Sequence, residues 1–367
     1  MNYRTLLINS SQNTFNLLAA LLLFVFSGCR ENTQMKPVFQ RVEQHMVVSD
    51  TINLNTGQDA FLDIAKVKLS KSHIGLLNPL SVSFRLYNLE GDILNFFTTN
   101  NNTEKRSSMN YIYGGVPIDF LFRDDSYISM FEINTSKIVS YTFAGERIDS
   151  KELHDDNKVS VPMYLYLNTF LSTGKGYIFS TRGGMALFNE KTEVQFNKDA
   201  GILFSLNSAT GSLNKEMTIS NLIESPIGGN LTFFQLGVFK NKRYIVFNND
   251  PTIHVFDVNS KYLTSISLTI PELEFAREIS LRQQASNLGI SYFNVTKSGF
   301  RFYIKKPIEN SEKYETFIVD LAMDLSTYGI IQGPDNVEYV INNPRSDLAF
   351  YTASSDGVVL YMADIIE

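Results

Sequence analysis

A short strand-and-turn pattern that recurs along the chain limits the possible folds more than any other feature of the sequence. Each copy has two apolar residues, one small or acidic polar residue, a further apolar residue and then a turn. We interpret each copy as the hairpin that joins the third and fourth strands of a four-stranded sheet. The copies recur about every 58 residues, a sixth and degenerate copy lies at 360–364, and the five clear copies are centred on Asn88, Thr142, Ser205, Asp257 and Asp320.

The fifth copy indicates how large one repeating unit is. Strand-like runs occupy residues 288–293, 300–305, 314–320 and 325–331, with short polar connections between them. Four such strands form one blade of a β-propeller. We therefore predict an all-β fold, a six-bladed β-propeller with four-stranded blades, and seven blades if residues 186–196 contain irregular strands. The 28 Phe and 18 Tyr residues also favour strands over helices.

The last copy lacks a fourth strand, and a segment near the N-terminus can supply it. Residues Met46–Leu54 have the composition of a strand and precede the first full copy. We predict that this segment pairs with the final copy, so that an N-terminal strand completes the last blade. Such pairing would cover two exposed strand edges at once.

The N-terminus has the features of an export signal. Ten apolar residues run from Leu17 to Phe26, too few to span a bilayer comfortably but typical of a signal peptide, and Arg4 supplies the positive charge before them. Small residues then precede Cys29, the only cysteine, in an arrangement that resembles the bacterial lipobox. We predict a signal peptide at 1–28, lipid attachment at Cys29, a flexible tether at 29–45 and a propeller domain at 46–367.

The lipobox, the tether and the repeats together resemble the TolB-like six-bladed β-propeller lipoproteins of Gram-negative bacteria. The resemblance covers nearly all of the chain after the signal peptide, and it implies a fold and a compartment rather than an activity. By the sorting rule of such lipoproteins, Arg30 after the cysteine favours the outer membrane. Which face of that membrane the protein occupies stays open.

The sequence contains no signature of a catalytic or metal centre. No two of the four histidines (His45, His73, His154 and His254) have the spacing of zinc ligands, and no Gly-x-Ser-x-Gly motif occurs. The acidic clusters His154-Asp155-Asp156 and Asp124-Asp125 are typical of turns. The glycine pairs at 114–115, 183–184 and 228–229 are also typical of turns, so we predict no metal and no cofactor.

A few side chains remain as candidates for binding. Arg123 and Arg182 stand beside turns, where a guanidinium could hold a carboxylate, although pairing with a neighbouring Asp is the alternative. His254 lies in a strand and is predicted to be a hydrogen-bonded core residue. The aromatic surplus, including Phe96-Phe97 and Phe233-Phe234, fits packing between blades, although an exposed aromatic cluster could stack on sugars.

These observations favour a binding protein over an enzyme. The net charge of −6 and the lack of a basic stripe make nucleic acid an unsuitable partner. We expect a monomeric binding or scaffold module, held at the outer membrane by its lipid, that presents a propeller face to an envelope protein or a small ligand. The alternative is a metal-assisted hydrolase or lyase with its site at the propeller axis. Because one fold can serve many functions, the fold does not decide between them.

Overall fold

The computed structural model of the chain divides into two units, Met1–Val38 and Phe39–Glu367, and only the second contains described residues. The described residues are 40–57, 65–99, 115–123, 125–133, 137–152, 170–173, 176–180, 201–207, 212–218, 234–278, 288–308, 314–333, 339–341, 346–354 and 357–366. Their fold is all-β in a propeller arrangement. Helix in these ranges is confined to α4 (Pro271–Glu274) and the 3-10 turn η2 (Phe275–Glu278), and no helix is long and apolar enough to cross a bilayer.

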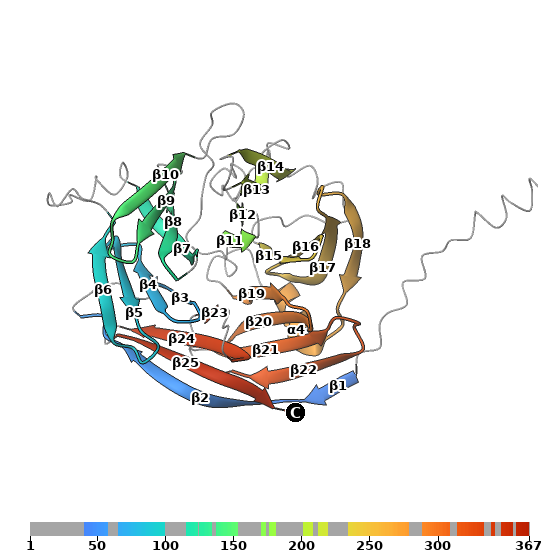
Figure 1. Ribbon diagram of the computed structural model, residues 1–367. Coiled ribbons are helices and arrows are strands. Elements are labelled where there is room, and N and C mark those ends of the chain that lie inside the picture. Colours follow the sequence, from blue (N-terminus) through green and yellow to red (C-terminus); the bar gives the residue numbers. More distant parts are fainter. Residues whose placement is uncertain are drawn as a thin grey trace, which may run out of the picture. The chain divides into compact units, whose positions relative to one another are not determined.

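Most of the described strands follow one another in antiparallel sheets of four (Figure 1). The first sheet contains β3 (Lys66–Leu69), β4 (Ile74–Asn78), β5 (Ser83–Tyr87) and β6 (Ile93–Thr98). The second contains β7 (Val116–Phe122), β8 (Tyr127–Ile133), β9 (Lys137–Thr142) and β10 (Arg147–Glu152). The third contains β11 (Phe170–Thr173), β12 (Gly176–Ser180), β13 (Gly201–Asn207) and β14 (Leu213–Thr218), and the fourth contains β15 (Phe234–Phe239), β16 (Lys242–Phe247), β17 (Asp250–Asp257) and β18 (Tyr262–Ser267).

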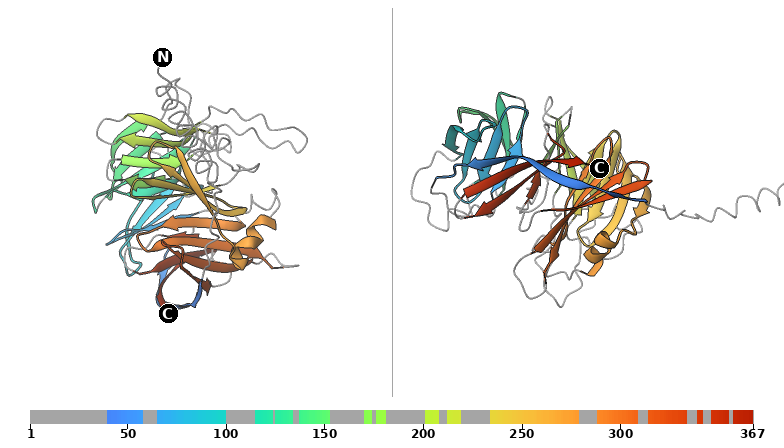
Figure 2. Two further views of the ribbon diagram at one scale, coloured as in Figure 1. Left: turned by 90° about the vertical axis from the view of Figure 1, so that its right-hand side faces the viewer. Right: turned by 90° about the horizontal axis from the view of Figure 1, so that it is seen from below.

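The two remaining sheets each include a strand from the N-terminal part of the domain. One has the order β1-β22-β21-β20-β19, formed by β1 (Gln40–Glu43), β19 (Gly289–Val295), β20 (Gly299–Pro307), β21 (Tyr314–Ala322) and β22 (Thr327–Gln332). The other has the order β2-β25-β24-β23, formed by β2 (His45–Leu54), β23 (Tyr339–Ile341), β24 (Leu348–Ser354) and β25 (Gly357–Ile366). Figure 2 also shows the blue N-terminal ribbon passing from β22 to β25.

The prediction of six equivalent four-stranded blades, or seven, is confirmed only in part. Among the described residues, five sheets have the four strands of a blade, whereas the sheet of β19–β22 has a fifth strand. That extra strand, β1, pairs with β22 in parallel, from Gln40 opposite Thr327 to Glu43 opposite Ile330. The sequence pattern detects local antiparallel hairpins and therefore gives no sign of a parallel pair between segments this far apart.

The predicted pairing of Met46–Leu54 with the final segment of the chain is confirmed. β2 pairs antiparallel with β25, from Met46 opposite Ile365 to Leu54 opposite Val358. Ile52 and Leu54 are buried, whereas Val47 and Val48 are exposed. The predicted tether is too long at its C-terminal end, because residues 40–43 form β1 and β2 begins at His45.

The recurring sequence pattern does mark the connection between third and fourth strands. Asn88 follows β5, and its side-chain Oδ1 accepts hydrogen bonds from the backbone N–H groups of Glu90 and Asp92. Asp257 ends β17 and accepts from Asn259 and Lys261 in the same way. Gly91 has a φ of 90°, a left-handed conformation that favours glycine and lets the hairpin turn close. Local side-chain hydrogen bonding thus closes the turns after Asn88, Thr142 and Asp257, whereas Ser205 and Asp320 bond to side chains of neighbouring strands.

The apolar core lies between neighbouring sheets. Val246 of the fourth sheet, and Leu268 just after that sheet, pack with Phe293 and Phe302 of the five-stranded sheet. Leu54, Val67 and Tyr351 bring the first and last sheets together, and the Tyr351 hydroxyl donates to the backbone oxygen of Ala65 at 2.6 Å. Between the five-stranded sheet and the last sheet, Tyr303, Ile318 and Ile331 pack against Leu348 and Phe350. Toward the candidate site, the side chains between the five-stranded sheet and the last sheet become polar.

Candidate functional site

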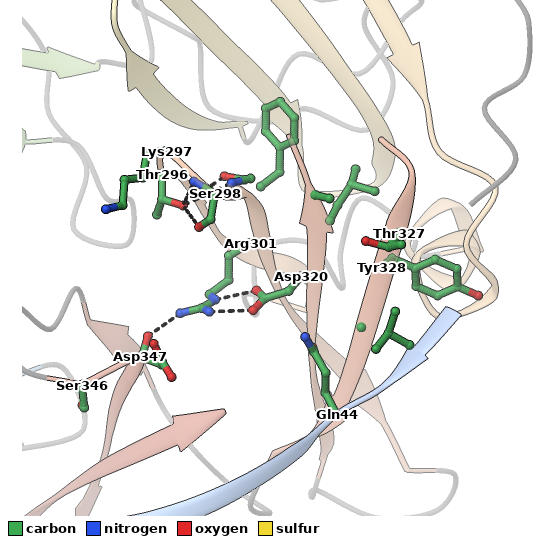
Figure 3. Close-up of a pocket in the computed structure, with 16 residues that line it drawn as sticks. Gln44, Thr296, Lys297, Ser298, Arg301, Asp320, Thr327, Tyr328, Ser346 and Asp347 are labelled. Carbon is green, nitrogen blue, oxygen red and sulfur yellow. Dashed lines mark hydrogen bonds and ion pairs between the residues drawn. The ribbon is translucent and has the colours of Figure 1, made fainter. Parts of the chain in front are cut away.

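A half-open pocket of about 400 Å³ lies where the five-stranded sheet meets the start of β24 (Figure 3). Its walls come from β1, from the adjoining ends of β20, β21 and β22, from the turn between β19 and β20, and from residues 346–347. The volume falls in the range of small-molecule sites, which combine concave shape with a few fixed polar groups. The pocket is therefore the candidate site among the described residues.

Strand register places four residues in one row across the floor of this pocket. Arg301 of β20 lies opposite Asp320 of β21, and Asp320 lies opposite Gly329 of β22. Gly329 lies opposite Val42 of the parallel strand β1. Because alternate residues of a strand point to opposite faces, the neighbours of Arg301, Phe300 and Phe302, pack into the core on the other side of the sheet.

Arg301 makes hydrogen bonds within its own sheet and to the segment before β24 of the last sheet. Its Nε donates to Asp320 Oδ1 and its Nη2 donates to Asp320 Oδ2, each at 2.6 Å, which is a bidentate ion pair. Its Nη1 donates to the backbone oxygen of Asp347 in the segment before β24. Burial by itself would lower the pKa of Arg301, but the hydrogen bonds and charge of Asp320 outweigh burial and raise it. Arg301 therefore stays charged and holds the two sheets together at the pocket.

Asp347 fixes the opposite wall. Its Oδ2 accepts a hydrogen bond from the backbone N–H of Ile365 in β25 at 3.0 Å. Its backbone oxygen is the one that accepts from Arg301. The carboxylate of Asp347 is thus held beside the Arg301–Asp320 pair, although the residue itself is exposed.

Gln44, which links β1 to β2, covers the floor of the pocket. Its side chain packs over Gly329 and occupies the space that a side chain at position 329 would fill. In Figure 3 the Gln44 side chain extends from the N-terminal ribbon toward Asp320. Within the described part of the chain, Gln44 Oε1 is buried and accepts no hydrogen bond. A buried amide oxygen without a donor costs roughly 1–3 kcal/mol.

The rim of the pocket is a tight polar turn. Thr296 Oγ1 accepts from the backbone N–H groups of Ser298 and Gly299, at 3.2 and 3.3 Å, and lies 2.7 Å from Ser298 Oγ. Lys297 is exposed and extends outward from this turn in Figure 3. The Tyr328 ring points away from Arg301 and packs against the core shared with the fourth sheet. The lining is thus mixed, with the polar groups of Arg301, Asp320, Gln44 and this turn beside apolar side chains such as Val42 and Leu321.

Of the two arginines proposed from the sequence, Arg123 is described by the structure and does not line this site. Arg123 lies after β7, where its guanidinium lies over the Tyr127 ring at 5.3 Å and its backbone N–H donates to Tyr127 O. Arg182 and Cys29 lie outside the described residues. Arg301 and Gln44 were missed, although Asp320 was used as a marker of the repeat. The signal that could have indicated this site is the pair itself: Arg301 and Asp320 lie in consecutive strands of one hairpin, where they face each other.

His254 is buried as predicted but is not hydrogen-bonded. It is 3% exposed in β17, and neither ring nitrogen has a partner among the described residues. Burial lowers its pKa to about 4, against an opposing effect of Asp250. No group of three or more His, Cys, Asp or Glu side chains that could hold a metal occurs in the described ranges. Residues 154–156 and Asp124 lie outside those ranges.

The fold and the pocket define a β-propeller protein with a polar site between two of its sheets. No protein-family model and no curated protein matches the sequence. A member of the DUF4221 family from Bacteroides vulgatus ATCC 8482 is similar in structure, with a TM-score of 0.56 and 11% identity over 89% of this chain and 99% of that chain. A protein of Bacteroides fragilis NCTC 9343 described as exported has a TM-score of 0.51 and 13% identity over 90% and 100% of the two chains. At these identities the likeness concerns the fold alone.

Proposed function

We propose that this chain is a lipid-anchored binding module of the cell envelope and that it holds a small polar ligand in the pocket on Arg301, Asp320 and Gln44. The observation that carries the proposal is an open pocket whose lining includes the Arg301–Asp320 ion pair and Gln44, and the Oε1 of Gln44 is buried without a donor within the described residues. A polar cavity with an unsatisfied acceptor is completed by a ligand or by water.

Binding without chemical change fits the state of the charged groups. The Arg301 guanidinium donates to Asp320 and Asp347, and both oxygens of Asp320 accept from it. A carboxylate held by a guanidinium through two parallel hydrogen bonds is fixed in position, as a recognition site requires. These groups suit recognition better than proton transfer.

The envelope address rests on the N-terminal sequence. The short apolar run before Cys29 and the small residues next to it favour export and lipid attachment, and Arg30 favours the outer membrane. We propose that the anchored protein is a monomer. Its partners are then the membrane, through the lipid, and the ligand in the pocket.

The binding proposal is tested by a matched pair of glutamine variants in the full-length protein, solubilised in detergent. Gln44→Leu removes the unsatisfied acceptor, whereas Gln332→Leu changes an exposed glutamine at the end of β22 that does not line the pocket. Thermal-shift screening with a library of small polar metabolites should find a compound that stabilises the wild-type protein saturably. We expect Gln44→Leu to weaken that compound at least about ten-fold and Gln332→Leu to leave it unchanged.

Two results would overturn the proposal. One is a library in which no compound stabilises the wild-type protein. The other is a ligand that binds Gln44→Leu as tightly as wild type, since its site would then lie elsewhere.

A further inference from the structure

The charged side chains around the pocket balance one another. Lys297 and Arg301 carry positive charge, and Asp320 and Asp347 carry negative charge, so their formal charges cancel. An anion that approached Arg301 would also meet the carboxylates of Asp320 and Asp347. A cation that approached Asp320 would meet Arg301. Placing an unpaired charge in such a partly buried site is costly, so the balance favours a neutral ligand.

The floor of the pocket has both free hydrogen-bond donors and free hydrogen-bond acceptors. A guanidinium has five N–H groups, and Arg301 uses three of them on Asp320 and Asp347. Each oxygen of Asp320 accepts from Arg301 and keeps a further lone pair. Gln44 Oε1 needs a donor. A ligand that fits must therefore donate to Asp320 and Gln44 and accept from Arg301 within a small space.

Hydroxyl groups meet this requirement better than other neutral groups. A hydroxyl is donor and acceptor at one atom, whereas a carboxamide separates its donor from its acceptor. Two hydroxyls on adjacent carbons can accept from Arg301 and donate to Asp320 and Gln44 at the same time. An apolar or aromatic ligand would bury these groups without partners, at a cost of about 1–3 kcal/mol for each. Because the Tyr328 ring faces away, it offers no stacking to offset that cost (Figure 3).

We infer that the ligand is a neutral polyhydroxylated molecule of the carbohydrate class, bound through adjacent hydroxyls on Arg301, Asp320 and Gln44. This inference rests on the proposed binding function and specifies its ligand. Arg301 donates hydrogen bonds to the ligand hydroxyls, and Asp320 and Gln44 accept hydrogen bonds from them.

The test uses sugars that differ only in charge. Galactose, galacturonate and galactosamine, and the corresponding glucose series, are titrated against the full-length protein by calorimetry and saturation-transfer NMR. Oligosaccharides of the neutral sugars form a further arm, which distinguishes a free monosaccharide from a residue of a longer glycan. We expect a neutral sugar to bind, and its uronate and amino analogues to bind at least ten-fold more weakly. Gln44→Leu should weaken the neutral sugar at least ten-fold, and Gln332→Leu should leave it unchanged.

The possible failures separate the two proposals. The ligand class is wrong if a charged analogue binds the pocket as tightly as the neutral sugar. It is also wrong if the metabolite screen finds only a ligand without hydroxyls whose binding depends on Gln44. In both cases the binding function stands. If no sugar and no screened compound binds in a Gln44-dependent way, both are wrong. Neutral-sugar binding that Gln44→Leu does not change also contradicts this site.

Discussion

At the scale of single residues, His254 shows how an unsatisfied polar group makes stability depend on pH. The imidazole lies 5.8 Å from the Phe247 ring in an edge-to-face arrangement, inside the interface between the third and fourth sheets. Because neither nitrogen has a partner in the described chain and burial disfavours the charged form, the ring is neutral in the folded protein at pH 7. The unfolded chain has no such constraint and takes up a proton near pH 6.5.

His254 should therefore make the protein sensitive to mild acid. Its folded-state pKa of about 4 lies below the value of 6.5 in the unfolded chain, so stability is complete above pH 6.5 and falls as the pH drops toward 4. The expected loss from this residue is about 2 kcal/mol between pH 7.5 and pH 5. Urea unfolding at these two pH values measures it. His254→Phe should remove most of the difference, and His45→Asn, which changes an exposed histidine of β2, should keep it.

At the scale of elements, β1 is a weakly held strand that completes the pocket. It consists of four residues, three of them exposed. The backbone N–H of its first residue, Gln40, donates to Ser326 O at 2.9 Å. The Arg41–Glu272 ion pair spans 4.0 Å with Arg41 mostly exposed, so it adds little. Val42 within β1 and Gln44 after it both line the pocket. A ligand there contacts β1 and must stabilise its docked state.

Docking of β1 and ligand binding should therefore strengthen each other, because coupling between two equilibria is reciprocal. Hydrogen exchange measures the effect of the ligand on β1. A saturating ligand should slow amide exchange in Gln40–Gln44 several-fold and leave the exchange rates in the edge strand β18 unchanged. Replacing Gln40–Glu43 by glycine and serine measures the reverse effect, and should weaken the ligand about ten-fold with a small effect on melting temperature. Equal exchange rates in β1 with and without ligand would contradict the coupling.

At the scale of the whole molecule, the N-terminal segment connects the predicted anchor directly to the folded sheets. β1 and β2 are strands of the domain, so only residues 30–39 separate Cys29 from β1. Ten residues span at most about 35 Å when fully extended. An anchor at Cys29 would therefore keep the propeller close to the membrane surface without taking part in its fold.

Cys29→Ala should accordingly separate membrane attachment from folding. In fractionated cells the wild-type protein should pellet with membranes and the variant should stay in the soluble fraction, because two or more acyl chains give stable anchoring and none remain in the variant. The melting temperature should be unchanged, since β1 and β2 lie C-terminal to the substitution. A variant that still pellets, or one that fails to fold, would count against this division of roles.

The sequence by itself determined the features that depend on local chemistry. Asn88 and Asp257 end third strands with the hydrogen bonds that close a hairpin, so the turn pattern predicts where each pair of strands joins. The composition of Met46–Leu54 predicts a strand, and the last repeat was the one that lacked a strand. The position of His254 in an apolar strand predicted that it is buried, but the sequence did not show that its ring lacks a hydrogen bond.

The tertiary structure alone decided the parallel pairing of β1 and the position of the pocket. Residues 40–43 are polar and lack a strand pattern, and they form a strand only because β22 offers them an edge with free N–H and C=O groups. The pocket arises where Arg301, Asp320, Gln44 and Asp347 meet from distant parts of the sequence. Their proximity results from register between strands and packing between sheets, and neither of these is encoded in the spacing of the residues along the chain.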